Sequence, residues 1–230
     1  MNIHSLKPAK DFAIQFGCKA IVYGPPGSAK TPGVNNAPRP LLLATEPGML
    51  SMRGSNVPTY CAFTPEAIDE FFKWFFESSE VRQFDTLAID SVSQMADIYL
   101  QAALSKKSSG GNKAHGLAAY GEMASETLKH IKRLYFMQNK HTYLICKQTI
   151  VDESNIQYRK PYFPGQQLPV EIPHMFDFVL HLAIQNVPSM GQVLAFRCIG
   201  SIDTMARART GNLNEFEQPH IGNLYQKAIT

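Results

Sequence analysis

Residues 24–31 carry the side-chain types that bind the phosphates of a nucleotide. The stretch reads Gly24, Pro25, Pro26, Gly27, Ser28, Ala29, Lys30 and Thr31. It fits the pattern G-x-x-x-x-G-K-[ST], except that Ala29 stands where the last glycine is expected. In such a loop backbone N–H groups face phosphate oxygens, the lysine reaches the β- and γ-phosphates, and the hydroxyl binds Mg²⁺. We therefore predict a phosphate-binding loop built on Lys30 and Thr31, with ATP and Mg²⁺ as its ligands.

Two features of this loop are unusual. We expect Ala29 to have a negative φ, because the chain should be entering a helix there, and a methyl group is costly only where φ is positive. Pro32 and Gly33 follow the loop directly. A helix that begins in this way is short or distorted, so we expect its dipole to contribute less than usual to phosphate binding.

One acidic residue, Asp90, ends the apolar run of residues 86–90. A carboxylate at a strand end beside a phosphate loop is placed to hold Mg²⁺ together with Thr31. Such a residue can instead cap the helix that follows. Because the phosphate loop is present we favour the magnesium role, and Ser91 is a candidate partner of the carboxylate.

Two further polar residues follow apolar runs. Glu46 comes after residues 41–45, where a carboxylate can polarise the water that attacks the γ-phosphate. Gln148 comes after residues 142–146, where a neutral amide can bind the γ-phosphate and transmit its loss to the following segment. The alternatives are a surface turn residue before Pro47 and an ordinary strand-end glutamine. We expect catalytic roles for both side chains.

Hydrophobic periodicity places these residues on alternating strands and helices. Short apolar runs predict buried strands at residues 19–23, 41–44, 86–90 and 142–146. Apolar residues spaced three and four apart predict helices at residues 64–78, 92–104 and 120–137. Two later runs predict an antiparallel hairpin at residues 176–184 and 193–199. This alternation indicates an α/β fold with a mainly parallel sheet.

Two connecting stretches lack either periodicity. Residues 105–116 are basic and rich in glycine, and we expect a flexible loop there. Residues 149–174 are polar and contain four prolines. A connection of this length without regular structure is unusual in a compact domain unless it has a function.

Length and composition set the broad class. The 230 residues are expected to form a single domain, with an N-terminal extension at residues 1–16 and a C-terminal tail at residues 201–230. A net charge of +3 means that nucleic-acid binding has to come from local patches. The four cysteines include no C-x-x-C pair, so we expect reduced, buried thiols in a cytoplasmic protein. No apolar stretch is long enough for a membrane span, and residues 1–16 do not read as a signal peptide.

The motifs together resemble the core of the RecA superfamily. GPPGSAKT, TEPG, LAIDS and ICKQ occur in this order. Further stretches are similar to phage-encoded RecA-like ATPases of the single-strand annealing type: APRPLLLATEPGMLSMR, FDTLAIDSVSQM, AYGEM, KPYFPGQQLP, IPHMFDFVLHL and MARARTGNL. The resemblance covers about residues 17–227. Its first motifs are shared by many ATPases, and the later ones are narrower.

The resemblance implies a RecA-like P-loop NTPase fold, a twisted and mainly parallel sheet flanked by helices, that uses ATP and Mg²⁺. It implies that Glu46 activates water, Asp90 serves Mg²⁺ and Gln148 senses the γ-phosphate. It also implies assembly into a ring or filament, with ATP bound between protomers. RecA-like assemblies often insert a K-x-R pair from a neighbour, and Arg207 and Arg209 stand at the matching place. Arginine forks suit phosphate oxygens, and the alternative is a solvated basic turn.

Two segments are candidates for binding single-stranded DNA. The first supplies Lys106, Lys107 and Lys113. The second supplies Tyr158, Arg159, Lys160 and Tyr162. In the second, aromatic residues alternate with cations, as stacking on bases and contact with phosphates require. It also follows Gln148, so the state of the nucleotide can reach it. The alternative is that both are solvated loops.

We therefore expect an ATPase of phage recombination or annealing that binds single-stranded DNA, assembles with itself and resides in the host cytoplasm. A single-stranded-DNA-binding protein is a further candidate partner. One alternative is a switch that binds ATP, hydrolyses it slowly or not at all, and acts through such a partner. Ala29 favours this hypothesis. Another is a small-molecule kinase, against which the sequence shows no acceptor pocket or basic lid.

Overall fold

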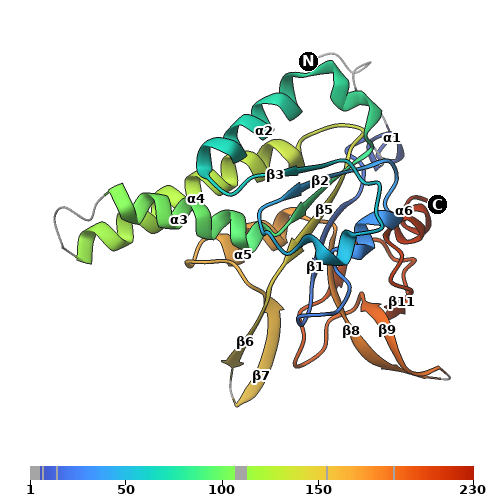
Figure 1. The fold of residues 1–230 in the computed structure, drawn as a ribbon. Helices are drawn as coiled ribbons and strands as arrows, with labels where there is room; N and C mark the ends of the chain where they lie inside the picture. Colours follow the sequence, from blue (N-terminus) through green and yellow to red (C-terminus); the bar gives the residue numbers. More distant parts are fainter. Residues whose placement is uncertain (1–5, 7, 14, 107–112, 154, 189) are drawn as a thin grey trace.

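The computed structural model describes residues 6, 8–13, 15–106, 113–153, 155–188 and 190–230 (Figure 1). The helices are α1 (Lys10–Ala13), α2 (Pro65–Glu77), α3 (Val92–Lys106), α4 (Lys113–Tyr135), α5 (Leu168–Met175) and α6 (Ile221–Ile229), with 3-10 helices at Pro32–Asn36, Met49–Met52 and Ser79–Gln83. The strands are β1 (Lys19–Tyr23), β2 (Pro40–Ala44), β3 (Thr59–Cys61), β4 (Thr86–Asp90), β5 (His141–Cys146), β6 (Gln148–Glu153), β7 (Ile156–Pro161), β8 (Phe178–Val187), β9 (Gly191–Arg197), β10 (Arg207–Ala208) and β11 (Phe216–Glu217).

A mainly parallel sheet forms the centre of the molecule. Within the described residues its strand order is β11-β9-β8-β1-β5-β4-β2-β3, and β10 pairs with β8. The six strands from β8 to β3 run parallel, whereas β9, β10 and β11 pair antiparallel. Strand β1 is buried along its whole length because helices cover both faces of the sheet. The four strands predicted from apolar runs are all present, and the C-terminal hairpin β8–β9 is confirmed.

Two hydrophobic cores lie on the two faces of the sheet. On one face, alternate strand residues such as Ile21 and Leu43 pack with apolar residues of α2, α3, α4 and α5. On the other face, their neighbours Val22 and Leu42 pack with α6 and the 3-10 helix Pro32–Asn36. This is the period-two alternation of a strand that is buried on both sides.

Helix α2 forms as its sequence predicts. Thr64 caps it, since its Oγ1 accepts a hydrogen bond from the Ala67 amide at 3.3 Å. Pro65 occupies the first turn, where a missing N–H costs nothing. The buried face consists of Ile68, Phe71, Phe72 and Phe75, which are core residues, as expected.

The prediction of a loop at residues 105–116 is wrong at both of its boundaries. Helix α3 runs on to Lys106, and α4 begins at Lys113, seven residues before the predicted start. The two helices pack closely on one another and extend beyond the sheet as an arm (Figure 1). This packing buries Ala119 and Met123 and offsets the poor helix propensity of Gly116 and Gly121. Residues 107–112 lie outside the described part of the chain.

The prediction that residues 149–174 lack regular structure is also wrong. Strands β6 and β7 form an antiparallel hairpin, with register from Gln148 opposite Pro161 to Glu153 opposite Ile156. Asn155 at the turn has a φ of 65°, which asparagine tolerates better than most residues. Helix α5 follows the hairpin, with Pro169 in its first turn and Pro173 inside it. All four prolines lie at the last residue of β7 or beyond it, so none interrupts the paired strands, and the β-branched residues 149–151 favour a strand.

Three of the cysteines, Cys18, Cys146 and Cys198, are buried free thiols, as expected. Cys61 is exposed at the sheet edge, which corrects the expectation that all four are buried. Across the part of the chain described here, no helix combines the length and the apolar character needed to cross a membrane.

Candidate nucleotide-binding site

The carboxyl ends of β1, β2, β4 and β5 meet at one edge of the sheet around a cavity of about 460 Å³. Five side chains singled out from the sequence line this cavity: Lys30, Thr31, Glu46, Asp90 and Gln148. They come from four separate segments of the chain, and the parallel strands bring them together. Ligands of open α/β sheets bind outside the carboxyl ends of the strands in just this way.

The loop after β1 surrounds the ammonium group of Lys30. Nζ of Lys30 donates hydrogen bonds to the carbonyls of Gly24 at 2.9 Å and Pro25 at 2.8 Å, and to Ser28 Oγ at 3.3 Å. Burial lowers the pKa of this lysine, while the carboxylates of Asp90 and Glu46 oppose the shift. The loop therefore holds one cation at the mouth of the cavity, where phosphate oxygens would bind.

Two glycines give the loop its path. A Cβ on Gly24 would lie 2.0 Å from the carbonyl oxygen of Leu182 in β8, so no side chain fits there. Gly27 has a φ of 78°, which L-residues rarely adopt.

The expected negative φ of Ala29 is wrong. Its φ is 60°, in the left-handed region, so the methyl group stands where a glycine would be unstrained. The chain turns before it becomes helical, and the Gly33 amide donates a hydrogen bond back to the Ala29 carbonyl at 3.1 Å. The loop keeps its shape at a cost in conformational energy.

Replacing Ala29 with glycine should therefore stabilise the protein. The left-handed conformation costs an L-residue about 1–2 kcal/mol, and the greater freedom of glycine in the unfolded chain offsets about 0.4–1 kcal/mol of that gain. We expect Ala29→Gly to raise the free energy of unfolding by about 0.5 kcal/mol, measured by chemical denaturation. The matched control is Ala118→Gly on the exposed face of α4, which should lower it by about 1 kcal/mol. Equal losses in both variants would contradict the strain at Ala29.

The helix after the loop is short, as predicted. It is a 3-10 helix of five residues, Pro32–Asn36, which starts with the proline. A helix this short adds little dipole to the phosphate site, and both Lys30 and Lys147 line the cavity as cations.

Thr31 and Asp90 face one another across the cavity floor. Thr31 Oγ1 donates to Asp90 Oδ2 at 2.5 Å. Burial raises the pKa of Asp90, as does the charge of Glu46, while the Thr31 hydroxyl and Lys30 lower it. Among the described residues no group of three or more His, Cys, Asp or Glu is arranged to hold a metal alone. A hydroxyl and a carboxylate that need phosphate oxygens and water to complete the shell fit Mg²⁺ in a nucleotide site.

Glu46 is held from two sides. Ser91 Oγ donates to Glu46 Oε1 at 2.5 Å, and Lys147 Nζ lies 3.6 Å from the same oxygen. Lys147 is held in turn by Gln94 Oε1 at 2.7 Å. The carboxylate thus has a fixed orientation at the cavity edge. The sequence indicated Ser91 only as a partner of Asp90, and Lys147 was missed.

Gln148 begins strand β6 and makes contact with β8. Its Oε1 lies 2.9 Å from Nε2 of His181. Burial lowers the pKa of His181 to about 4, with Arg159 and Arg197 adding to the shift, so the ring is neutral near pH 7. Its ring also packs on Tyr23, with centroids 4.9 Å apart. His181 was missed because only the pairing of β1 with β8 brings it beside Gln148.

Arg207 and Arg209 are not brought to this cavity. Strand β10 pairs with the amino-terminal end of β8, away from His181. The Arg207 guanidinium binds the carbonyls of Pro173 and Phe176, the second at 2.8 Å. Arg209 binds the carbonyl of His174. Both side chains therefore secure the end of α5 in their own chain, so a role at a phosphate would have to be in a neighbouring chain.

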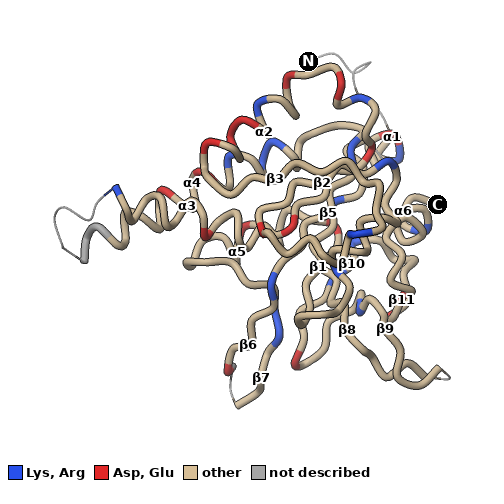
Figure 2. The backbone as a smooth tube through the Cα atoms, viewed as in Figure 1, with Lys and Arg blue, Asp and Glu red and all other residues tan. Residues whose placement is uncertain are grey.

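The candidate DNA-binding residues fall on two projecting parts of the molecule. Lys106 ends α3 and pairs with Glu122 of α4 at 3.3 Å. Lys107 lies outside the described residues, and Lys113 starts α4. Tyr158, Arg159 and Lys160 lie on β7, which is basic in Figure 2, and Tyr162 follows that strand. Arg159 is paired with Asp203 at 2.5 Å, which restrains its guanidinium.

A protein-family model described as AAA domain matches residues 17–210. A search of the curated proteins finds no match. Similar solved structures include a KaiC-like protein of the archaeon Pyrococcus horikoshii, at 12% identity and a TM-score of 0.46, covering 79% of this chain and 77% of that one.

Two other solved structures are also similar to the chain. An ATPase of a bacterial type III secretion system has 12% identity and a TM-score of 0.47, over 84% of this chain and 58% of that one. The RadB recombinase has 16% identity and a TM-score of 0.38, over 79% and 80%. The family match spans most of the chain, and it agrees with the sheet order and the phosphate loop described above. The chain belongs to the AAA domain family, and its fold is a mainly parallel sheet flanked by helices with a C-terminal antiparallel hairpin.

Proposed function

We propose that this protein binds ATP with Mg²⁺, hydrolyses it, and uses the cycle to hold single-stranded DNA during phage recombination or annealing. The observation that carries the proposal is the convergence of Lys30, Thr31, Glu46, Asp90 and Gln148 on one cavity. A phosphate loop alone would bind a nucleotide. A loop with a restrained carboxylate and a strand-end amide has the parts needed to activate water beside the γ-phosphate.

The residues divide the work of hydrolysis among them. Lys30 binds the β- and γ-phosphates and offsets their charge. Thr31 and Asp90 would hold Mg²⁺, which neutralises charge on the transferred phosphoryl group. Glu46 accepts the proton of the attacking water, with its carboxylate oriented by Ser91 and Lys147.

The hairpin β6–β7 links the nucleotide cavity to the proposed DNA surface. Gln148 lines the cavity at the open end of the hairpin, where it pairs with Pro161 of β7. Tyr23 of β1 donates its hydroxyl to the Arg159 carbonyl at 3.1 Å, which ties β7 to the strand that carries the phosphate loop. A change in the contact between Gln148 and phosphate would therefore reach strand β7 through a few hydrogen bonds.

Assembly is part of the proposal. With Arg207 and Arg209 at the far end of β8, their guanidinium groups can complete a phosphate site only in a neighbouring protomer, after exchanging their carbonyl partners for phosphate oxygens. We propose a homo-oligomer, ring or filament, and a single-stranded-DNA-binding protein as a further partner.

A slow switch is the second candidate, and one observation favours it. The positive φ of Ala29 stores strain in the phosphate loop, which can favour binding over fast turnover. Measuring phosphate release with and without single-stranded DNA separates the two candidates. Turnover that DNA stimulates supports the ATPase, whereas ATP binding with neither DNA binding nor DNA stimulation supports the switch.

The hairpin is expected to supply the phosphate contacts of the DNA site. Lys160→Ala should weaken binding of a fluorescent oligo(dT) and lower the slope of log affinity against log salt by about one unit. Anisotropy titrations at several salt concentrations measure both quantities. The matched control is Lys73→Ala, an exposed lysine of α2. If both variants bind like the unmodified protein, the DNA site lies elsewhere.

A further inference from the structure

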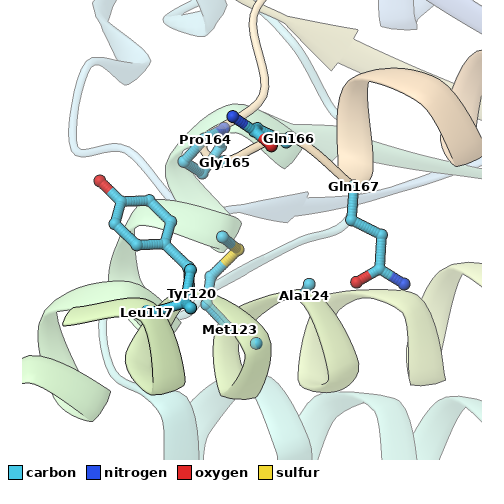
Figure 3. A pocket seen from close by; sticks show the side chains of 9 residues that line it. Leu117, Tyr120, Met123, Ala124, Pro164, Gly165, Gln166 and Gln167 are labelled. Atoms are coloured by element: carbon cyan, nitrogen blue, oxygen red, sulfur yellow. The ribbon is translucent and has the colours of Figure 1, made fainter. Parts of the chain in front are cut away.

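A second cavity lies between helix α4 and the loop that precedes α5, and none of the residues lining it lines the nucleotide cavity. Its volume is about 580 Å³, and its lining differs from that of the nucleotide cavity. Figure 3 shows the ring of Tyr120 and the side chain of Met123 rising from α4 towards the loop, with Gln167 pointing back to the helix. The walls are mainly apolar, and Gln166 and Gln167 of the loop also line the cavity.

The loop is shaped to approach the helix. Gly165 has a φ of +77°, and a Cβ there would lie 3.2 Å from Tyr120 Cδ1 and 3.4 Å from Met123 Cε. Gln167 Nε2 donates to Glu171 at 2.6 Å, and Glu171 pairs with Lys132 of α4 at 3.0 Å. These bonds fix the loop and α5 on α4, so the cavity is a formed part of the fold.

We propose that this cavity takes one base of single-stranded DNA, stacked on the ring of Tyr120. This assignment rests on the proposed function. Tyr120 is 43% exposed, which leaves a ring face open at the mouth of the cavity. A base combines a π-face with a polar edge, and the cavity offers an aromatic face and two carboxamides.

The path of the chain places the cavity next to the proposed phosphate contacts. The loop leaves β7 directly after Lys160 and Pro161. Lys106 of the arm pairs with Glu122 of α4 and lines a different pocket. Lys160 of the hairpin is thus the cation that lies near the aromatic cavity along the chain, and a cation beside an aromatic face is the arrangement that single-strand binding uses.

The loop that precedes α5 is also hydrogen-bonded to a residue that lines the nucleotide cavity. The amide of Tyr162 donates to the carbonyl of Lys147 at 2.8 Å, and Ser93 Oγ donates to the Tyr162 carbonyl at 2.6 Å. Ser93 Oγ also accepts from the Lys147 amide at 3.0 Å. Lys147 lines the nucleotide cavity, so a shift there on binding ATP moves the start of the loop that carries Gly165 and Gln166.

The test compares oligo(dT) with an abasic oligonucleotide of the same length, which keeps the phosphates and lacks the bases. Tyr120→Ala in the full-length protein should weaken binding of oligo(dT) about tenfold and leave binding of the abasic strand unchanged. Tyr120→Phe keeps the ring and should bind like the unmodified protein. Tyr60→Ala is the matched control, because Tyr60 is 37% exposed on β3, away from the arm. Photocross-linking with an iodouracil-substituted strand should modify the peptide that contains Tyr120.

Each other outcome overturns the assignment in a distinguishable way. If Tyr120→Ala binds oligo(dT) normally while Lys160→Ala does not, the cavity is not a base site and the DNA-binding function stands. If the unmodified protein binds neither strand, the proposed function fails and the cavity assignment fails with it. If Tyr120→Ala alters only the mass of the assembled protein, the cavity contacts a second copy of the chain instead.

Discussion

Replacing Lys30 with alanine is expected to abolish ATP binding at concentrations that saturate the unmodified protein. Lys30 is the only cation that the phosphate loop itself supplies, and it sits within the ring of loop carbonyls. The short helix after the loop offers little electrostatic support in its place. Removing one partner from a buried, hydrogen-bonded charge pair costs about 2–5 kcal/mol, which weakens binding at least about 30-fold.

Isothermal titration with ATP and Mg²⁺ measures this loss. Lys30→Met is the companion variant, because it keeps an unbranched apolar stem and removes only the charge. The two variants should lose the same affinity if the ammonium group is responsible. Melting temperatures of both show whether the loop keeps its fold. Unchanged ATP affinity in Lys30→Ala would contradict the assignment of the nucleotide site.

Replacing Glu46 with glutamine should stop hydrolysis while leaving nucleotide binding intact. Glutamine matches glutamate in size but cannot accept a proton from water. General-base catalysis contributes about 10²–10⁴-fold, so we expect turnover to fall by that factor. The hydrogen bond from Ser91 can still reach the carboxamide oxygen, so the side chain should keep its position.

Phosphate release and titration with ATP, both on the same preparation, separate turnover from binding. Ser91→Ala is the graded control: it frees Glu46 from one contact and should lower turnover less than Glu46→Gln. Turnover by Glu46→Gln within a few-fold of the unmodified rate would move the base to another residue. Loss of ATP binding in this variant would instead give Glu46 a role in holding the nucleotide.

The sequence predicted what depends on local pattern. The apolar runs before Gly24 and before Asp90 are short, continuous and bounded by turn residues, so they identified buried strands correctly. Because the strands are parallel, their polar end residues meet at one edge of the sheet. The sequence could therefore predict which side chains line the cavity. Helix α2 was predictable for the same reason, since its cap and its apolar face lie within one segment.

The rest depends on contacts between distant segments. The φ of Ala29 is set by where the loop meets the sheet, and no local pattern reports it. Helix α4 begins early because α3 packs against it, which offsets the glycines in its first turns. Lys147 and His181 acquire their roles through the pairing of β5, β1 and β8, and their sequence neighbours give no sign of it.

The close approach of Gly24 to Leu182 has a consequence for how the molecule is made. The phosphate loop lies early in the chain, but one wall of it belongs to β8, which is synthesised much later. A nascent chain that has formed β1, β2, β4 and β5 still lacks β8, the strand against which the phosphate loop packs. Contacts of such long sequence separation form late in folding, because the entropy of closing the intervening chain has to be overcome first. Nucleotide would therefore stabilise only the completed sheet, and ATP in the cell would favour finished molecules over partly folded ones.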